Sequence, residues 1–253
     1  MKISTKNKQN LTTIYSINFG LPKRSKKLIK FIIIHYTGMR NETAAIKKLC
    51  SKNSQVSAHY FIKNTGKILN LVPDLYEAWH AGKSSWKNYK SLNQNSIGIE
   101  ITNPGHEFGY KAFPKKQIFS LLKLSKFLMK EYKISPKNIL GHSDIAPQRK
   151  KDPGEKFPWE YFSKNRIGIW HSLSKRELIK NRKLKTSIIE KEFFFNSLSK
   201  IGYLKKTQRK RNKEKYLRDV TKAFQRRYRQ ELVNGRIDQE CLLICKNILK
   251  KHN

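Results

Sequence analysis

The chain has 253 residues, of which 38% are hydrophobic and 11% aromatic, so it can bury a core and is not disordered throughout. Lysine and arginine total 55 against 18 acidic residues, which gives a net charge of +37. Such a charge attracts nucleic acid, anionic lipid or an anionic cell wall, but the basic residues are spread along most of the chain, which favours a solvated surface. No basic recognition motif with interleaved aromatic residues is present, so specific nucleic-acid binding ranks last.

Three cysteines, Cys50, Cys241 and Cys245, exclude a framework of paired disulfides. Cys241 and Cys245 lie four residues apart on an expected helix and are predicted to pack as small hydrophobic side chains. The first fifteen residues are polar and lack an apolar leader segment, and no stretch is apolar enough to span a membrane. We therefore expect a soluble, cytoplasmic monomer; a periplasmic or cell-wall-associated protein is the alternative.

Strands that alternate with helices predict an α/β domain over residues 29–162, after an irregular arm over residues 1–28. The apolar run over residues 31–34 is typical of an interior strand buried on both faces. The turn Asn64-Thr65-Gly66 between two apolar runs predicts a hairpin. The other expected elements are helices over residues 42–52, with Asn41 as N-cap, and 114–132, and strands over residues 58–62, 67–72 and 97–101.

Residues 163–190 are basic and lose the strand pattern, so we expect a linker there. Residues 191–253 predict a small bundle of three short helices, with Gly202 ending the first and a turn at Asn234-Gly235 before the third. The densest basic run, residues 205–215, is expected to be a solvated loop between the first two helices.

A segment rich in proline and glycine, residues 141–154, holds His142, Lys150 and Asp152. His142 and Asp152 are too far apart for one helical face, but a loop folded back on itself brings both to one ion. His35 ends the apolar strand upstream. Two imidazoles and one carboxylate leave one position of a zinc ion open, as hydrolysis requires, so we expect zinc at His35, His142 and Asp152. The alternative for His35 is a core histidine bonded to a backbone carbonyl.

Glu100 lies between two isoleucines, so the alternation of a strand points its carboxylate away from them and requires a partner for it. Beside a metal, Glu100 is suited to act as general base; the alternative is a salt bridge to a lysine. Lys150 is suited to stabilise negative charge on a tetrahedral intermediate, or is a surface lysine. Asp144 either caps its own loop or orients a metal ligand.

Of the other histidines, His80 follows Trp79 in a loop, where it either contacts a ligand or packs. His59 faces either the core or a cleft. Three more histidines have no supporting context: His106, His171 and His252.

Five motifs follow one another in the chain: His35-Tyr36-Thr37, Ser57-Ala58-His59-Tyr60, Ala78-Trp79-His80-Ala81-Gly82, Ser96-Ile97-Gly98-Ile99-Glu100 and residues 142–154. In order and spacing they resemble the zinc-dependent N-acetylmuramoyl-L-alanine amidases of type 2, relatives of phage lysozyme-type amidases and peptidoglycan recognition proteins. The resemblance covers residues 30–162 and implies a mixed central sheet flanked by helices. It also implies zinc held by His35, His142 and Asp152, with Glu100 and Lys150 as catalytic partners.

The implied reaction is hydrolysis of the amide between N-acetylmuramic acid and L-alanine, in peptidoglycan or in anhydro-muropeptide turnover fragments, as in cell-wall degradation and muropeptide recycling. We place Trp79, His80 and Asn103 at the substrate. The C-terminal part is similar to a small three-helix peptidoglycan-binding domain, through residues 198–203, 220–228 and 234–238. A non-catalytic muropeptide-binding protein is the alternative, but the chain retains all three expected ligands together with Glu100 and Lys150, which favours the enzyme.

Overall fold

The computed structural model describes residues 11–203 and 213–252. The chain divides into two compact units, and each is described on its own. Unit 1 consists of Met1–Gly82 and Ser91–Leu140, and unit 2 of Lys83–Lys90 and Gly141–Asn253. Within the described ranges, no helix combines the length and the apolar character needed to cross a membrane.

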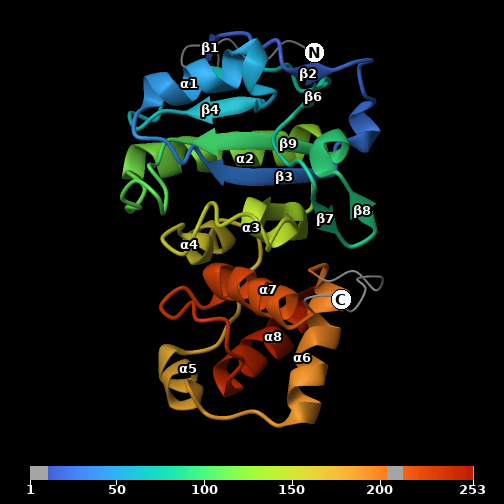
Figure 1. The fold of residues 1–253 in the computed structure, drawn as a ribbon, viewed down its shortest axis with the longest axis vertical. Helices are drawn as coiled ribbons and strands as arrows, with labels where there is room; N and C mark the ends of the chain where they lie inside the picture. Colours follow the sequence, from blue (N-terminus) through green and yellow to red (C-terminus); the bar gives the residue numbers. More distant parts are fainter. Residues whose placement is uncertain (1–10, 204–212, 253) are drawn as a thin grey trace. The chain divides into compact units, whose positions relative to one another are not determined.

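A six-stranded sheet forms the centre of unit 1 (Figure 1). Strands β4 and β5 pair antiparallel, whereas β3 with β9, β4 with β9 and β1 with β5 are parallel. The predicted mixed sheet and the predicted hairpin are therefore confirmed. The strands in sheet order are β1 (Leu11–Thr13), β5 (Ile68–Asn70), β4 (Tyr60–Ile62), β9 (Ser96–Ile101), β3 (Phe31–Tyr36) and β10 (Ile139–Gly141).

Strand β3 lies between β9 and β10, and its first five residues are buried, which confirms the predicted interior strand. Helix α1 (Glu42–Cys50) begins at Asn41, whose Oδ1 accepts a hydrogen bond from the Ala44 amide at 2.8 Å, as the sequence predicts. Ala45 and Leu49 of α1 pack against β4 and β5 in one apolar cluster. The long helix α2 (Lys115–Glu131) follows Pro114, also as expected.

The segment expected to be an irregular arm is in part regular, and this expectation was wrong for residues 11–13, 19–20 and 26–28. Strand β1 pairs with β5, and β2 (Phe19–Gly20) pairs with β6 (Glu77–Ala78). A 3-10 helix, η2 (Lys26–Leu28), ends the segment. The sequence pattern misses these strands because they are short: β1 adds to the edge of the six-stranded sheet, and β2 forms a separate two-stranded sheet with β6. The remaining short helices of unit 1 are η3 (Lys52–Ser54), η4 (Leu92–Asn95) and η5 (Pro136–Asn138).

Unit 2 is mainly helical (Figure 1). The three predicted C-terminal helices are confirmed as α6, α7 and α8, and Gly202, at a φ of 138°, ends α6. The expected linker contains a further helix, α5, which Ser174 caps. The basic run lies largely outside the described residues, since residues 204–212 are not described. The elements are β7 (Ser85–Trp86), β8 (Tyr89–Lys90), α3 (His142–Ile145), α4 (Trp159–Lys164), α5 (Lys175–Asn181), α6 (Ile188–Ile201), α7 (Lys213–Tyr228) and α8 (Gln239–His252).

Cys241 and Cys245 lie on α8 with both side chains buried and unbridged, as predicted. Burial raises the pKa of each thiol to about 12, so both stay protonated and act as packing groups.

One buried cation joins two segments of unit 1 that are separate along the chain. The Arg24 side chain is 8% exposed, and its guanidinium donates to the backbone carbonyls of Asp74 (2.8 and 3.1 Å), Asn93 (2.7 Å) and Gln94 (3.1 Å). Burial lowers the pKa of Arg24 to about 10, so the group remains charged at neutral pH. One carbonyl in the loop at Asp74 and two in the 3-10 helix η4 therefore depend on one side chain.

Arg24→Met keeps the aliphatic stem but leaves those buried carbonyls without donors. We expect the free energy of unfolding to fall by about 2–3 kcal/mol in urea titrations. Lys47→Met, on the exposed face of α1, is the matched control and should change stability by less than about 0.5 kcal/mol. Equal effects of the two substitutions would contradict the role given to Arg24.

Candidate active site

The register of the sheet brings two of the predicted site residues together. His35 on β3 is the direct partner of Glu100 on the parallel strand β9. Partners in a parallel pair point to the same face of the sheet, so both side chains lie on one face. Ile99 and Ile101 are fully buried, as the predicted alternation along β9 requires. His35 itself is 1% exposed.

His80 contacts His35 through its ring. His35 Nε2 lies 3.0 Å from His80 Nδ1, and His80 Nε2 lies 3.2 Å from Ser96 Oγ. The two imidazole rings meet edge to face, with centroids 5.1 Å apart. Both ring nitrogens of His80 thus have partners inside the protein.

His59 is a core histidine. Its ring is fully buried: Nδ1 accepts from the Gly98 amide at 3.0 Å, and Nε2 lies 2.8 Å from Arg24 Nη2 and 3.0 Å from the Tyr76 carbonyl. Burial, together with the charge of Arg24, holds the pKa of His59 well below its usual value. Of the two alternatives for His59, the structure supports the core.

The glycine- and proline-rich segment folds back as predicted. His142 is the first residue of α3, and its Nδ1 lies 3.0 Å from Asp152 Oδ2. The Ser143 amide donates to the Asp152 carbonyl at 2.8 Å, which closes the loop. Both side chains are buried. The sequence did not predict the short helix α3.

Asp144 accepts three hydrogen bonds. The Gly141 amide donates to Oδ2 at 2.8 Å, Tyr203 Oη donates to Oδ1 at 2.6 Å, and Arg227 Nη1 donates to Oδ2 at 2.6 Å. The bond from Gly141 supports the first of the two alternatives for Asp144, a cap of its own loop, whereas the ion pair to Arg227 was not foreseen. Burial, followed by the charge of Asp144, holds the pKa of Tyr203 well above its usual value, so this hydroxyl is a permanent donor.

Lys150 lies at the end of a turn, where its amide donates to the Ala146 carbonyl at 3.0 Å, and its side chain is half-buried. Its neighbour Arg149 is a site residue that the sequence reasoning missed. Arg149 Nη2 lies 3.4 Å from His142 Nε2 and donates to the Lys83 carbonyl at 3.0 Å. Burial lowers the pKa of Arg149, against the nearby charge of Asp152. The available signal was a run of three successive cations, Arg149 to Lys151, in the loop that follows His142.

Asn103 uses its side chain to shape the loop after β9. Its Oδ1 accepts from the Gly105 amide at 3.1 Å, and its Nδ2 donates to the Lys111 carbonyl at 2.8 Å. The Trp79 amide donates to Ser57 Oγ at 2.8 Å. Contact of Asn103, Trp79 or His80 with a substrate remains a prediction.

His106, which the sequence analysis set aside, lies in the loop after β9. Its Nδ1 is 2.8 Å from Tyr36 Oη, and its ring stacks on Tyr110 with centroids 4.3 Å apart. Tyr36 directly follows His35 in the sequence. The cluster of Tyr36, His106 and Tyr110 is therefore attached to the strand that carries a predicted metal ligand.

Among the described residues, one group offers three potential metal ligands. One ligand atom from each of His35, His142 and Asp152 lies within 4.8 Å of the other two, and all three side chains are buried. Two imidazole nitrogens and a carboxylate oxygen at this spacing are compatible with a metal ion.

Residues 24–155, just over half of the chain, match the family described as N-acetylmuramoyl-L-alanine amidase (Amidase_2). The chain is 34% identical over 236 residues to the N-acetylmuramoyl-L-alanine amidase AmiD of Escherichia coli K12, an alignment that covers 88% of this chain and 83% of AmiD. The chain belongs to the N-acetylmuramoyl-L-alanine amidase family.

Other members of the family match this chain over alignments of different length. The 1,6-anhydro-N-acetylmuramyl-L-alanine amidase AmpD of Haemophilus influenzae is 40% identical over 109 residues, which is 43% of this chain and 57% of AmpD. The solved complex of E. coli AmiD with anhydro-N-acetylmuramic acid-L-Ala-D-gamma-Glu-L-Lys has a TM-score of 0.77 at 32% identity, covering 92% of this chain and 93% of that one. The complex of Pseudomonas aeruginosa AmpDh3 with anhydromuramic pentapeptide has a TM-score of 0.76 at 29% identity, covering 92% and 95%.

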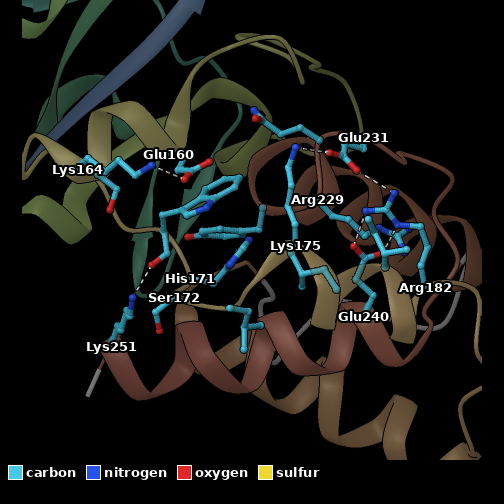
Figure 2. A pocket seen from close by; sticks show the side chains of 17 residues that line it. Glu160, Lys164, His171, Ser172, Lys175, Arg182, Arg229, Glu231, Glu240 and Lys251 are labelled. Atoms are coloured by element: carbon cyan, nitrogen blue, oxygen red, sulfur yellow. Dashed lines mark hydrogen bonds and ion pairs between the residues drawn. The ribbon is translucent and has the colours of Figure 1, made fainter.

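This amidase also carries a pocket in unit 2, of about 610 Å³ (Figure 2). Trp170, His171 and Tyr228 form an aromatic wall, with the Trp170 and Tyr228 ring centroids 6.0 Å apart. Charged side chains line much of the rest: Lys164 pairs with Glu160, and Arg182 pairs with Glu231 and Glu240.

The contribution of the Asp144–Arg227 ion pair to stability can be tested by substitution. Arg227→Met leaves a buried carboxylate without its counter-charge, and we expect a loss of about 3–5 kcal/mol in the free energy of unfolding. Tyr203→Phe removes only one hydrogen bond and should cost about 1–2 kcal/mol in the same urea titrations. Arg218→Met, exposed on the same helix, is the control. An Arg227→Met protein as stable as the control would contradict this account.

Proposed function

We propose that the chain hydrolyses the amide between N-acetylmuramic acid and L-alanine, in peptidoglycan or in its anhydro-muropeptide fragments, with zinc held by His35, His142 and Asp152. The observation that carries the proposal is the buried group of two imidazoles and a carboxylate within 4.8 Å, in a chain of the amidase family. The substrate class is supported by the relatives, since the solved AmiD complex holds an anhydro-muropeptide.

The donor set fits zinc better than a hard cation. Calcium and magnesium prefer all-oxygen ligands, whereas zinc is commonly bound by two histidines and one carboxylate with the fourth position open. Asp152 Oδ2 already faces His142 Nδ1 at 3.0 Å, so these two donors point toward the same space. When bound, zinc supplies Lewis acidity, which polarises the scissile carbonyl and activates water.

Glu100 is proposed as the general base. Its position opposite His35 in the parallel register places a carboxylate beside the first metal ligand on the same face of the sheet. There Glu100 accepts the proton of the attacking water and passes it to the leaving amine of L-alanine. Fully buried isoleucines on either side of Glu100 along β9 limit the carboxylate to this one face.

Lys150 is proposed to stabilise the negative charge that develops on the carbonyl oxygen. Its backbone is fixed by the turn from Ala146, and its half-buried side chain is less hydrated than a surface lysine. Arg149, in contact with His142, adds a second positive charge to the same segment.

Glu100→Gln should separate catalysis from metal binding. The amide has nearly the size of the carboxylate but does not accept the proton, so we expect kcat to fall about 10²- to 10⁴-fold while the zinc content is retained. Asp152→Ala, or a chelator added to the unchanged protein, should remove both zinc and activity. The assay follows release of the stem peptide from a purified anhydro-muropeptide.

The outcomes distinguish the enzyme from a binding protein. Muropeptide binding without release of stem peptide at any zinc concentration would support the non-catalytic alternative. Full activity and full zinc content in Asp152→Ala would show that the ligand assignment is wrong.

We further propose that the helices of unit 2 bind peptidoglycan through the pocket of Figure 2. The aromatic wall offers an apolar surface to a ligand, and the charged and polar side chains around it offer hydrogen-bond partners. His171 is 9% exposed, and its Nδ1 has no hydrogen-bond partner among the described residues. Burial lowers the pKa of His171 to about 4, so the ring is neutral at pH 7 and adds no positive charge to the aromatic wall.

Trp170→Ala should weaken sedimentation of the protein with insoluble peptidoglycan, because one of the three side chains of the aromatic wall is lost, and should leave hydrolysis of small muropeptides unchanged. Phe127→Ala, a partly exposed aromatic of α2, is the matched control. Binding that is equal in both variants but lost at raised salt would assign wall attachment to surface charge instead of the pocket.

A further inference from the structure

In unit 1, a chain of hydrogen bonds connects the His35 ring through His80 and Ser96 to the Leu92 carbonyl. Ser96 Oγ lies 2.5 Å from the Leu92 carbonyl oxygen and 3.2 Å from His80 Nε2. His80 Nδ1 in turn lies 3.0 Å from His35 Nε2. Leu92 and Ser96 are fully buried, so bulk water does not compete for these hydrogen bonds.

The direction of each bond follows from the carbonyl end. The Leu92 oxygen can only accept, so the single hydrogen of the Ser96 hydroxyl is donated to it. Ser96 Oγ must then accept from an N–H at His80 Nε2. A neutral imidazole carries one N–H, so His80 Nδ1 accepts from an N–H at His35 Nε2. The lone pair of His35 is left on Nδ1.

The backbone around His80 fixes the position of its ring. Asn93 Oδ1 accepts from the amides of His80 (3.2 Å) and Ala81 (2.7 Å). The ring lies against β9 at Gly98, where a Cβ atom would be 2.3 Å from His80 Cγ. His59 packs edge to face against the same ring, with centroids 5.6 Å apart. A side chain at position 98 would displace His80 from this contact.

We propose that Ser96 and His80 are positioning residues, which hold His35 in the tautomer that presents Nδ1 to the metal. The proposal rests on the proposed function, in which His35 is a zinc ligand. It gives His80 a task other than the substrate contact expected from the sequence. A hydrogen bond to the second nitrogen of a ligating histidine fixes its tautomer and orientation, and its loss commonly lowers metal affinity.

The first test measures zinc affinity by competition with a chromophoric chelator. Ser96→Ala and His80→Leu should each bind zinc about 10- to 100-fold more weakly than the unchanged protein. His80→Asn should restore part of the affinity, because its Oδ1 offers an acceptor near the position of Nδ1. Ser125→Ala is the control, since this serine is fully buried on α2 and its hydroxyl has no hydrogen-bond partner among the described residues.

The second test reads the tautomer directly. Nitrogen-15 NMR of the metal-free protein should show the proton of His35 on Nε2, and a mixture of tautomers in Ser96→Ala. This readout needs neither zinc nor activity, so it still tests the hydrogen-bond chain if the unchanged protein binds no zinc and the proposed function fails. Unchanged tautomers and unchanged zinc affinity in both Ser96→Ala and His80→Leu would overturn the proposal.

Discussion

The buried carboxylate of Asp144 is the interaction on which the order of unit 2 depends. A buried carboxylate costs several kcal/mol unless its oxygens are paired, and here an amide, a phenol and a guanidinium all donate to it. The three donors come from β10, from the residue after Gly202 and from α7. Arg227 also lies over the Trp159 ring at 4.1 Å. The C-terminal helices are therefore part of the structure that holds α3, whose first residue is His142, and are more than an attached binding domain.

The two histidines of the proposed zinc site are supported in different ways. His142 meets Asp152 through a loop that closes on itself within one short stretch of chain. His35 is supported by His80 and Ser96, which reach it only because β3 and β9 are parallel neighbours and His80 lies against β9. The first arrangement depends on turn chemistry and the second on sheet register. A hydrolytic metal site needs both, because ligands that shift independently do not keep one coordination position open.

This difference also explains what the sequence could predict. The interior strand β3, the hairpin of β4 and β5, the cap at Asn41 and the meeting of His142 with Asp152 all follow from patterns within a few residues. The partnership of His35 with Glu100, the bond of His80 to Ser96 and the ion pair of Asp144 with Arg227 join segments that are distant along the chain. Contacts of this kind produce no periodic pattern in the local sequence. The motifs therefore identified the residues but did not show which of them contact one another.

The positive charge of the chain has two physically distinct parts. Among the described residues the buried cations are arginines, Arg24, Arg226, Arg227 and Arg229, and none is a lysine. Arg227 and Arg229 pair with Asp144 and Asp238, and Arg24 donates to backbone carbonyls, so their charge is used within the protein. Guanidinium suits this task because its planar donors satisfy several acceptors at once, whereas ammonium is strongly hydrated. Any long-range attraction to an anionic polymer therefore falls to the lysines and to the exposed arginines such as Arg218, whose screened charges act on such a surface without selecting a bond to cleave. In the proposed function, selection of the amide is left to the proposed metal ligands, to Glu100 and to the groups that hold them.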